Sequence, residues 1–188
     1  MFRHTSVLVM RKKVKKRTTI VFDSRDREFL DRLISEGKES GIKSFLSKLF
    51  DIYRSMTIYD WKYPGECYSG ISRTAFFAQE NLQTLIDFIQ KDKRREVGRR
   101  MGEATRISIT SSLGLKRVER KNWSKILRRL RIFGYGDFIL QKNIVIVRNP
   151  FIPDLEVLTG FLEGILDCNL KTRTMTPPII LEAEKEKV

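Results

Sequence analysis

Hydrophobic residues recur with helical spacing in two neighbouring segments near the N-terminus. The clearer one spans residues 42–53, where a single helical face collects Ile42, Phe45, Leu46, Leu49, Phe50 and Tyr53. An earlier helix is predicted to begin after Asp23 or Ser24, which can cap it, and to end near Gly37 or Gly41. Residues 17–22, RTTIVF, are β-prone. The predicted order is therefore strand, helix, turn, helix.

The rest of the chain alternates helical and strand patterns. A helix is predicted from Ser72 to about Gln90, and a second one begins at Asn122 or Ser124 with Trp123, Ile126, Leu127 and Leu130 on its core face. A β-hairpin is predicted at residues 138–140 and 144–147, a helix at 155–168 and a strand at 179–182. This order predicts the α+β class, with a small antiparallel sheet packed on helices.

These elements divide the chain into five segments. Residues 1–14 form a basic N-terminal arm, residues 15–56 the strand-helix-helix module, and residues 57–71 an aromatic linker with Pro and Gly. Residues 72–184 form a helix-rich domain with the small sheet, and residues 185–188 a charged tail. The linker aromatics could stack on bases or fix the linker to a neighbouring surface, and the sequence favours the second role.

The strand-helix-helix module cannot be stable as a single chain. One six-residue strand would lack hydrogen-bond partners, and a unit of roughly 40 residues buries too little surface to fold alone. A two-fold homodimer solves both problems, because the strands of two chains can pair antiparallel above four helices. Alternate side chains of such a ribbon face opposite ways, so Arg17, Thr19 and Val21 would face outward.

The charge of the chain favours a polyanionic partner. Lys and Arg total 37 against 23 Asp and Glu, a formal net charge of +14. Six of the seven residues 11–17 are basic, so Lys12, Lys13, Lys15 and Lys16 are expected to hold DNA phosphates. Six of residues 91–100 are also basic, as either a second phosphate-binding surface or a solvated face. In the segment 91–106, which begins with this cluster, Gly98 and Gly102 predict the close approach of another helix or backbone.

Several classes of function lack the residues they need. The one histidine, His4, and the two cysteines, Cys67 and Cys168, do not make a disulfide framework, a zinc site or a common catalytic set. There is no P-loop, no run of 18 apolar residues and no pattern typical of a signal peptide. We therefore expect a protein that is not an enzyme, needs no cofactor or metal, does not engage membranes and is cytoplasmic.

The segment KKRTTIVFDSRDREFLDRLISEGKESGIKSFLSKLFDIY resembles the ribbon-helix-helix family of repressors and plasmid copy-control proteins. The resemblance implies that Arg17, Thr19 and Val21 read DNA bases, and that the backbone amides around Lys43 and Ser44 clamp a phosphate. Two features depart from the family pattern. Val21 is apolar where the family more often has a polar residue, and the turn GIKSF is about one residue shorter than usual.

The segment WSKILRRLRIFGYGDFILQKNIVIVRNPF, with LTGFLEGILDC after it, resembles the 4-vinyl-reductase-type domain. That domain is related to subunits of the eukaryotic transport-particle tethering complex. The resemblance implies a domain that binds small or hydrophobic ligands, with Cys168, Phe138 and Phe161 lining the pocket. The alternative is that all three are ordinary core residues, and the residue types favour it.

Together these features predict a sequence-specific, double-stranded DNA-binding transcription regulator that acts as a homodimer in the nucleoid. Its β-ribbon would enter the major groove, and its C-terminal domain would sense a small hydrophobic ligand or help dimerisation. Three alternatives remain open at this point. They are an architectural or partition protein that coats DNA, an RNA-binding protein with a basic arm, and a protein-assembly module.

Overall fold

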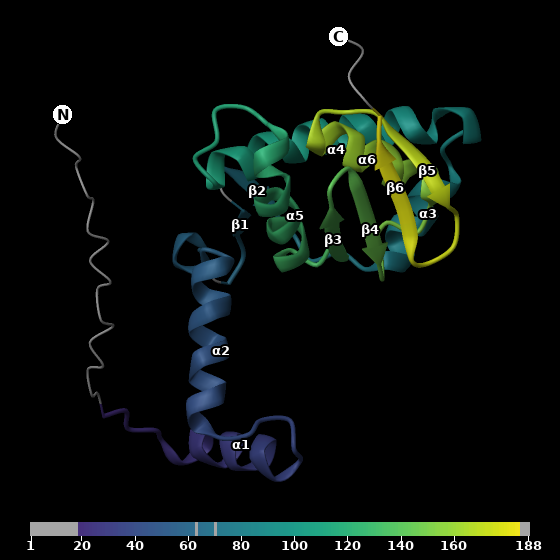
Figure 1. The fold of residues 1–188 in the computed structure, drawn as a ribbon. Helices are drawn as coiled ribbons and strands as arrows, with labels where there is room; N and C mark the ends of the chain where they lie inside the picture. The colour runs from purple at the N-terminus through teal and green to yellow at the C-terminus, as the bar shows by residue number, and fades with distance from the viewer. Residues whose placement is uncertain (1–18, 63, 70, 185–188) are drawn as a thin grey trace, which may run out of the picture. The chain divides into compact units, whose positions relative to one another are not determined.

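The computed structural model describes residues 19–62, 64–69 and 71–184 of the chain. These residues form helices and two small antiparallel sheets, which agrees with the predicted α+β class (Figure 1). Contacts divide them into two compact units, one ending at Ser47 and the other beginning at Lys48.

Both N-terminal helices form where the sequence predicts them. Helix α1 spans Ser24–Ser35 and helix α2 spans Ile42–Ser55. Asp23 caps α1, because its Oδ1 accepts a hydrogen bond of 2.8 Å from the backbone N–H of Asp26. The helix ends before Gly37, whose φ of +69° is the left-handed conformation that favours glycine.

The segment before α1 forms no strand in the single chain. Residues 19–23 have no regular secondary structure, and Arg17 and Thr18 lie outside the described residues. Side-chain exposure nevertheless alternates here, since Val21 is 91% exposed, Ile20 is 47% exposed and Phe22 is half-buried. A strand needs a hydrogen-bonding partner, and within this chain no described segment pairs with these residues.

The apolar face of α2 is uncovered in the single chain. No residue of α2 is buried, and Phe50 is 58% exposed. Its exposed apolar side chains also include Leu49, Ile52 and Tyr53. By contrast, Leu30 of α1 is buried. An amphipathic helix normally buries its apolar stripe, so this face of α2 lacks the cover that its sequence pattern requires.

A small hairpin replaces the start of the helix predicted at Ser72. Strand β1, Cys67–Ser69, pairs antiparallel with β2, Ser72–Thr74, so the hairpin includes residues predicted as linker. An extended segment leads from β2 to helix α3, Gln79–Asp87. The prediction of a helix from Ser72 to Gln90 is therefore wrong over its first seven residues. The apolar spacing that suggested it includes Ala75 and Ala78, both of which are exposed.

Four antiparallel strands form the larger sheet, in the order β3-β4-β6-β5. They are β3, Asp137–Gln141; β4, Ile144–Arg148; β5, Leu170–Thr174; and β6, Ile179–Ala183. The predicted hairpin and final strand are confirmed as β3, β4 and β6. Strand β5 was not predicted, because its charged positions Lys171 and Arg173 are typical of a sheet edge rather than of a buried strand.

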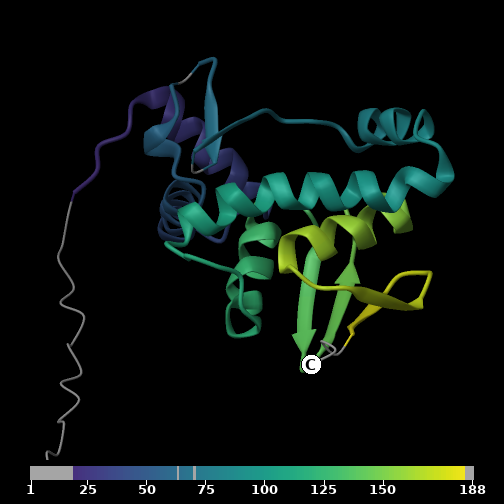
Figure 2. The same ribbon diagram turned by 90° about the horizontal axis from the view of Figure 1, so that it is seen from above.

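Helix α6, Leu155–Leu166, lies between this sheet and helix α4, Arg94–Ser112 (Figure 2). Its ten residues from Val157 to Leu166 are all buried, as expected for a helix covered on all sides. Helix α5, Trp123–Ile132, buries the four core residues that the sequence predicts. Three short 3-10 helices complete the fold: η1, Ile58–Asp60; η2, Lys91–Lys93; and η3, Arg120–Asn122.

Helices α4 and α6 are in backbone contact through glycines. A Cβ atom at Gly98 would lie 2.2 Å from the carbonyl oxygen of Val157, and one at Gly102 would lie 2.1 Å from that of Phe161. The close approach predicted from these two glycines is therefore confirmed. Two glycines of α6 were not singled out in advance: Gly160 and Gly164 face the carbonyl oxygens of Arg95 and Arg99 in the same way. No side chain larger than hydrogen fits at these positions.

Candidate functional site

The predicted DNA-contacting residues lie partly within the described chain. Thr19 and Val21 are exposed, as base-reading residues must be. Lys43 is exposed and Ser44 half-buried in the first turn of α2, where backbone N–H groups are available to an anion. Arg17 lies outside the described residues, as do the arm residues Lys12, Lys13, Lys15 and Lys16.

The basic cluster at residues 91–100 is largely engaged in structural ion pairs. Arg95 and Arg99 contact the carboxylate of Glu163 at 2.7 and 3.0 Å, and Arg94 contacts Asp154 at 2.7 Å. Arg100 pairs with Glu96 on its own helix. The sequence left this cluster open between a phosphate-binding surface and a solvated face. Its arginines in fact tie α4 to the α6 region of the fold.

Glu163 is the centre of this network. Its side chain is 1% exposed and accepts hydrogen bonds from both arginines and from the backbone N–H of Leu170 at 2.8 Å. Burial alone would raise the pKa of this carboxyl, but the hydrogen bonds from Arg95 and Leu170 outweigh it and the pKa is lowered. Glu163 is therefore ionised in the folded protein at neutral pH, and its charge is neutralised internally.

A second basic surface lies on and before α5. Residues 114–131 contain eight basic residues and one acidic residue, a net charge of +7. Lys116, Lys125 and Arg128 are exposed, and among the described residues no carboxylate pairs with them. An exposed surface with unneutralised lysine and arginine attracts phosphate groups.

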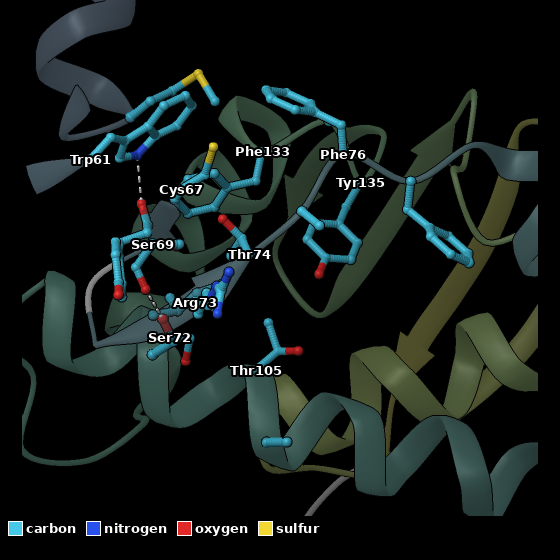
Figure 3. A pocket seen from close by; sticks show the side chains of 18 of the residues that line it. Trp61, Cys67, Ser69, Ser72, Arg73, Thr74, Phe76, Thr105, Phe133 and Tyr135 are labelled. Carbon is cyan, nitrogen blue, oxygen red and sulfur yellow. Dashed lines mark hydrogen bonds between the residues drawn. The ribbon is translucent and has the colours of Figure 1, made fainter. Parts of the chain in front are cut away.

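A cavity of about 540 Å³ opens in the second unit (Figure 3). The β1–β2 hairpin and the segment after it form one wall, and α4 and the turn between α5 and β3 form the others. Seven aromatic side chains line it: Trp61, Tyr68, Phe76, Phe77, Phe133, Tyr135 and Phe151. A cavity of this size, lined mainly by aromatic groups with a few polar ones, is typical of a small-molecule site.

Specific hydrogen bonds hold the hairpin wall in place. The hydroxyl of Ser108 on α4 donates to the carbonyl of Ser69, and both residues are buried. Trp61 Nε1 donates to the carbonyl of Tyr68 at 2.9 Å (Figure 3). Further along, the side-chain amide of Gln79 donates to the carbonyl of Phe151 at 3.0 Å. The wall is thus fixed to both α4 and the loop after β4.

Polar groups are few in the cavity and are placed at defined points. The hydroxyls of Tyr135 and Thr105 lie across the space from Arg73 (Figure 3). Burial raises the pKa of Tyr135, against the effect of a hydrogen bond with Thr105, so the phenol stays protonated and available as a donor. Arg73 is the one charged residue among the described residues that line the cavity. The cavity therefore favours a neutral or anionic ligand over a cation.

The three residues predicted to line a pocket do not line this cavity. Phe138 and Phe161 are buried in the core. The ring of Phe161 stacks on the ring of Tyr135, with 5.0 Å between the ring centroids. Cys168 is half-buried, and burial raises the pKa of its thiol to about 12. Phe138 and Phe161 are therefore core residues in this structure, and Cys168 packs against the same core.

The described residues offer two further negative findings. They contain no cluster of three or more His, Cys, Asp or Glu side chains able to hold a metal ion. None of their helices combines the length and apolar character needed to cross a membrane.

Comparisons with protein-family models, with curated proteins and with solved structures give no match to this chain. The two family resemblances therefore rest on the sequence motifs alone.

Proposed function

We propose that the protein is a homodimeric, double-stranded DNA-binding transcription regulator, in which residues 15–56 form a ribbon-helix-helix module. The observation that carries the proposal is the uncovered apolar face of α2, which lies in a chain segment led by a strongly basic arm. A second copy of the same module would cover this face. The alternating exposure around Val21 fits the two-stranded ribbon that such a dimer would form.

Selection from a random duplex DNA library at near-physiological salt tests the proposal. A two-fold, base-reading dimer is expected to recover a short inverted repeat. Recovery of tightly bound DNA without any common motif would favour a coating protein instead. Absence of binding to duplex DNA, in a protein shown to be folded, would contradict the proposal. Single-stranded RNA serves as the competitor that tests an RNA-binding role.

Thr19→Ala is expected to weaken binding to the selected inverted repeat about 10- to 100-fold, while binding to unrelated duplex DNA changes little. The reason is that a base contact contributes about 1–3 kcal/mol of discrimination, whereas phosphate contacts carry the non-specific affinity. Fluorescence anisotropy with the two duplexes measures the ratio. Thr57→Ala, outside the module, is the matched control. An equal loss on both duplexes would remove Thr19 from base reading.

A second candidate function, a DNA-coating architectural or partition protein, is favoured by the unpaired basic surface of α5. Footprint length separates the two functions. A regulator protects a short palindrome, whereas a coating protein protects DNA progressively as its concentration rises.

Neutralising the arm with Lys12→Gln and Lys13→Gln is expected to lower the slope of log affinity against log salt by about one unit per lost phosphate contact. Lys125→Gln with Arg128→Gln tests the α5 surface in the same titration. A regulator that binds through its N-terminal module alone loses slope only with the arm variants. A coating protein loses it with both sets. An unchanged slope for Lys12 and Lys13 would exclude the arm from the interface.

A further inference from the structure

We infer that the cavity beside the β1–β2 hairpin binds a small aromatic carboxylate, and that its occupancy changes the affinity of the protein for DNA. The regulatory half of this inference rests on the proposed function. The binding half stands on the cavity alone.

The cavity is a surface cleft that opens to solvent beside the segment after β2, where Phe76 is 82% exposed. Its volume of about 540 Å³ lies within the range of about 300–1,000 Å³ that is usual for small-molecule sites. Its aromatic walls offer edge-to-face and stacked contacts to a flat ring, and Tyr135 is itself held rigidly by rings on two sides. It stacks on Phe161 at 5.0 Å and meets Phe151 edge-on at 6.4 Å.

The polar groups select the charge of the ligand. The guanidinium of Arg73 lies across the space from the hydroxyls of Tyr135 and Thr105 (Figure 3). Among the described lining residues none is acidic. A ligand carboxylate would meet the guanidinium of Arg73 and the phenol of Tyr135 as donors, whereas the hydroxyl of Thr105 already donates to the carbonyl of Met101 at 2.9 Å. A ligand with an ammonium group would meet Arg73, because the acid that interacts with Arg73, Glu66, is not a lining residue and is already paired with Lys62 and Tyr68.

The cavity also adjoins the end of α2. Met56, which lines the cavity, directly follows Ser55, the last residue of that helix. The guanidinium of Arg129 donates to the carbonyl of Ser55 and stacks over the ring of Phe133, 5.3 Å from its centroid. Phe133 is a cavity wall. The ring of Phe133 therefore borders the cavity and also contacts Arg129, the residue that hydrogen-bonds to the end of α2.

Arg129 is suited to hold the end of α2, because no carboxylate among the described residues competes for its guanidinium. Burial lowers its pKa. Its position depends on Phe133, on the hydroxyl of Ser112 at 3.3 Å and on the carbonyl end of α2, where a cation is favoured by the helix dipole. A ligand that moves or locks the ring of Phe133 thus changes how the end of α2 is held. Helix α2 begins at Ile42, inside the proposed DNA-binding module, so the two sites are linked by one helix.

Isothermal titration of the full-length protein with benzoate and naphthoate tests the binding half, with benzylamine and naphthylmethylamine as cationic counterparts of the same shape. The carboxylates are expected to bind and the amines to bind at least tenfold more weakly. Arg73→Gln is expected to weaken carboxylate binding about 10- to 100-fold, the range typical of a lost charged hydrogen bond. Lys171→Gln on β5, which removes one exposed positive charge away from the cavity, is the matched control.

The regulatory half is tested by anisotropy with the selected duplex, with and without saturating naphthoate. An operator affinity that shifts at least fivefold is expected, because coupling between sites is typically 5- to 150-fold. Arg129→Lys keeps the charge but loses the planar fork, so it is expected to retain naphthoate binding and to lose most of the shift.

The outcomes are separable. Lack of binding by either carboxylate at about millimolar concentration overturns the inference, whatever the DNA result. Equal binding of acids and amines overturns the assignment of charge, and bound naphthoate with unchanged operator affinity overturns the coupling. Failure of the proposed function would appear without any ligand, as a protein that does not bind duplex DNA.

Discussion

Gly102→Ala is expected to destabilise the protein by about 3 kcal/mol, at the upper end of the cost of overpacking a core. Helix propensity alone predicts the opposite sign, because alanine is about 1 kcal/mol more favourable than glycine within a helix. At this position, however, a Cβ atom would lie 2.1 Å from the carbonyl oxygen of Phe161, which is backbone and cannot rotate away. The two helices must separate to accept it.

Urea denaturation measures this effect, and Gly114→Ala is its control. Gly114 has a φ of +63° and no neighbour within 4 Å of its Cβ position, so its substitution carries only a backbone cost of about 1–2 kcal/mol. The thermal midpoint of Gly102→Ala is expected to fall by roughly 6–12 °C. If Gly102→Ala were as stable as the unmodified protein, the backbone contact between α4 and α6 at Gly102 would be wrong.

Arg95→Met combined with Arg99→Met is expected to destabilise the protein by about 3–5 kcal/mol at neutral pH. The double substitution removes both arginines from Glu163, whose side chain is 1% exposed, and leaves a buried carboxylate without a counter-ion. Arg100→Met is the matched control, since it removes an exposed arginine whose partner Glu96 is also exposed. Its cost is expected to stay within about 0.5 kcal/mol.

The pH dependence of the same variant gives an independent signature. In the unmodified protein the pKa of Glu163 is lowered. The stability that ionised Glu163 contributes is therefore present above the ordinary carboxyl pKa and is lost as the pH falls through the lowered pKa of Glu163. Without the arginines, burial would raise the pKa of Glu163, and the protein would then lose stability as the pH rises through that raised pKa. The difference in unfolding free energy between the two proteins should therefore shrink on acidification. A difference that is constant from about pH 7 to about pH 4 would contradict this account.

Adding Glu163→Gln to the double variant is expected to recover part of the lost stability, because a neutral amide costs less to bury than an unpaired carboxylate. A triple variant less stable than the double one would show that Glu163 stabilises the fold by another route.

Local patterns were sufficient to predict the elements whose apolar side chains are buried. Helix α5 and strand β4 bury one face, and the residues on that face are the ones that their apolar spacing selects. Helix α6 was predicted from its apolar residues, although it is buried on all sides. The spacing of Gly98 and Gly102 likewise predicted a close contact, although the sequence could not show that the partner was α6. That information is non-local, since the contacting residues are about 60 positions away along the chain.

The sequence misled where exposure and tertiary contacts decide the structure. The segment from Ser72 has apolar residues at helical spacing, but it forms β2 and then an extended segment, residues 75–78, in which Phe76 is 82% exposed. The cavity was not predicted, because this extended segment forms part of its wall and the sequence pattern had assigned it to a helix. The signal available in the sequence was the pair Phe76 and Phe77, which an amphipathic helix of that register would not bury together. The resemblance assigned Phe138 and Phe161 to a pocket, whereas their residue types favoured the core, where they lie.

The parallel contact between α4 and α6 determines the order of events during synthesis. Helix α4 ends at Ser112 and α6 at Leu166, so the glycine face of α4 has no partner until the intervening hairpin and helix have been made. At a ribosomal rate of about 5–20 residues per second this interval lasts roughly 3–10 s. Glu163, which carries the buried charge, is synthesised only at the end of this interval, as part of α6. The core of the second unit therefore cannot be completed until α6 has been synthesised.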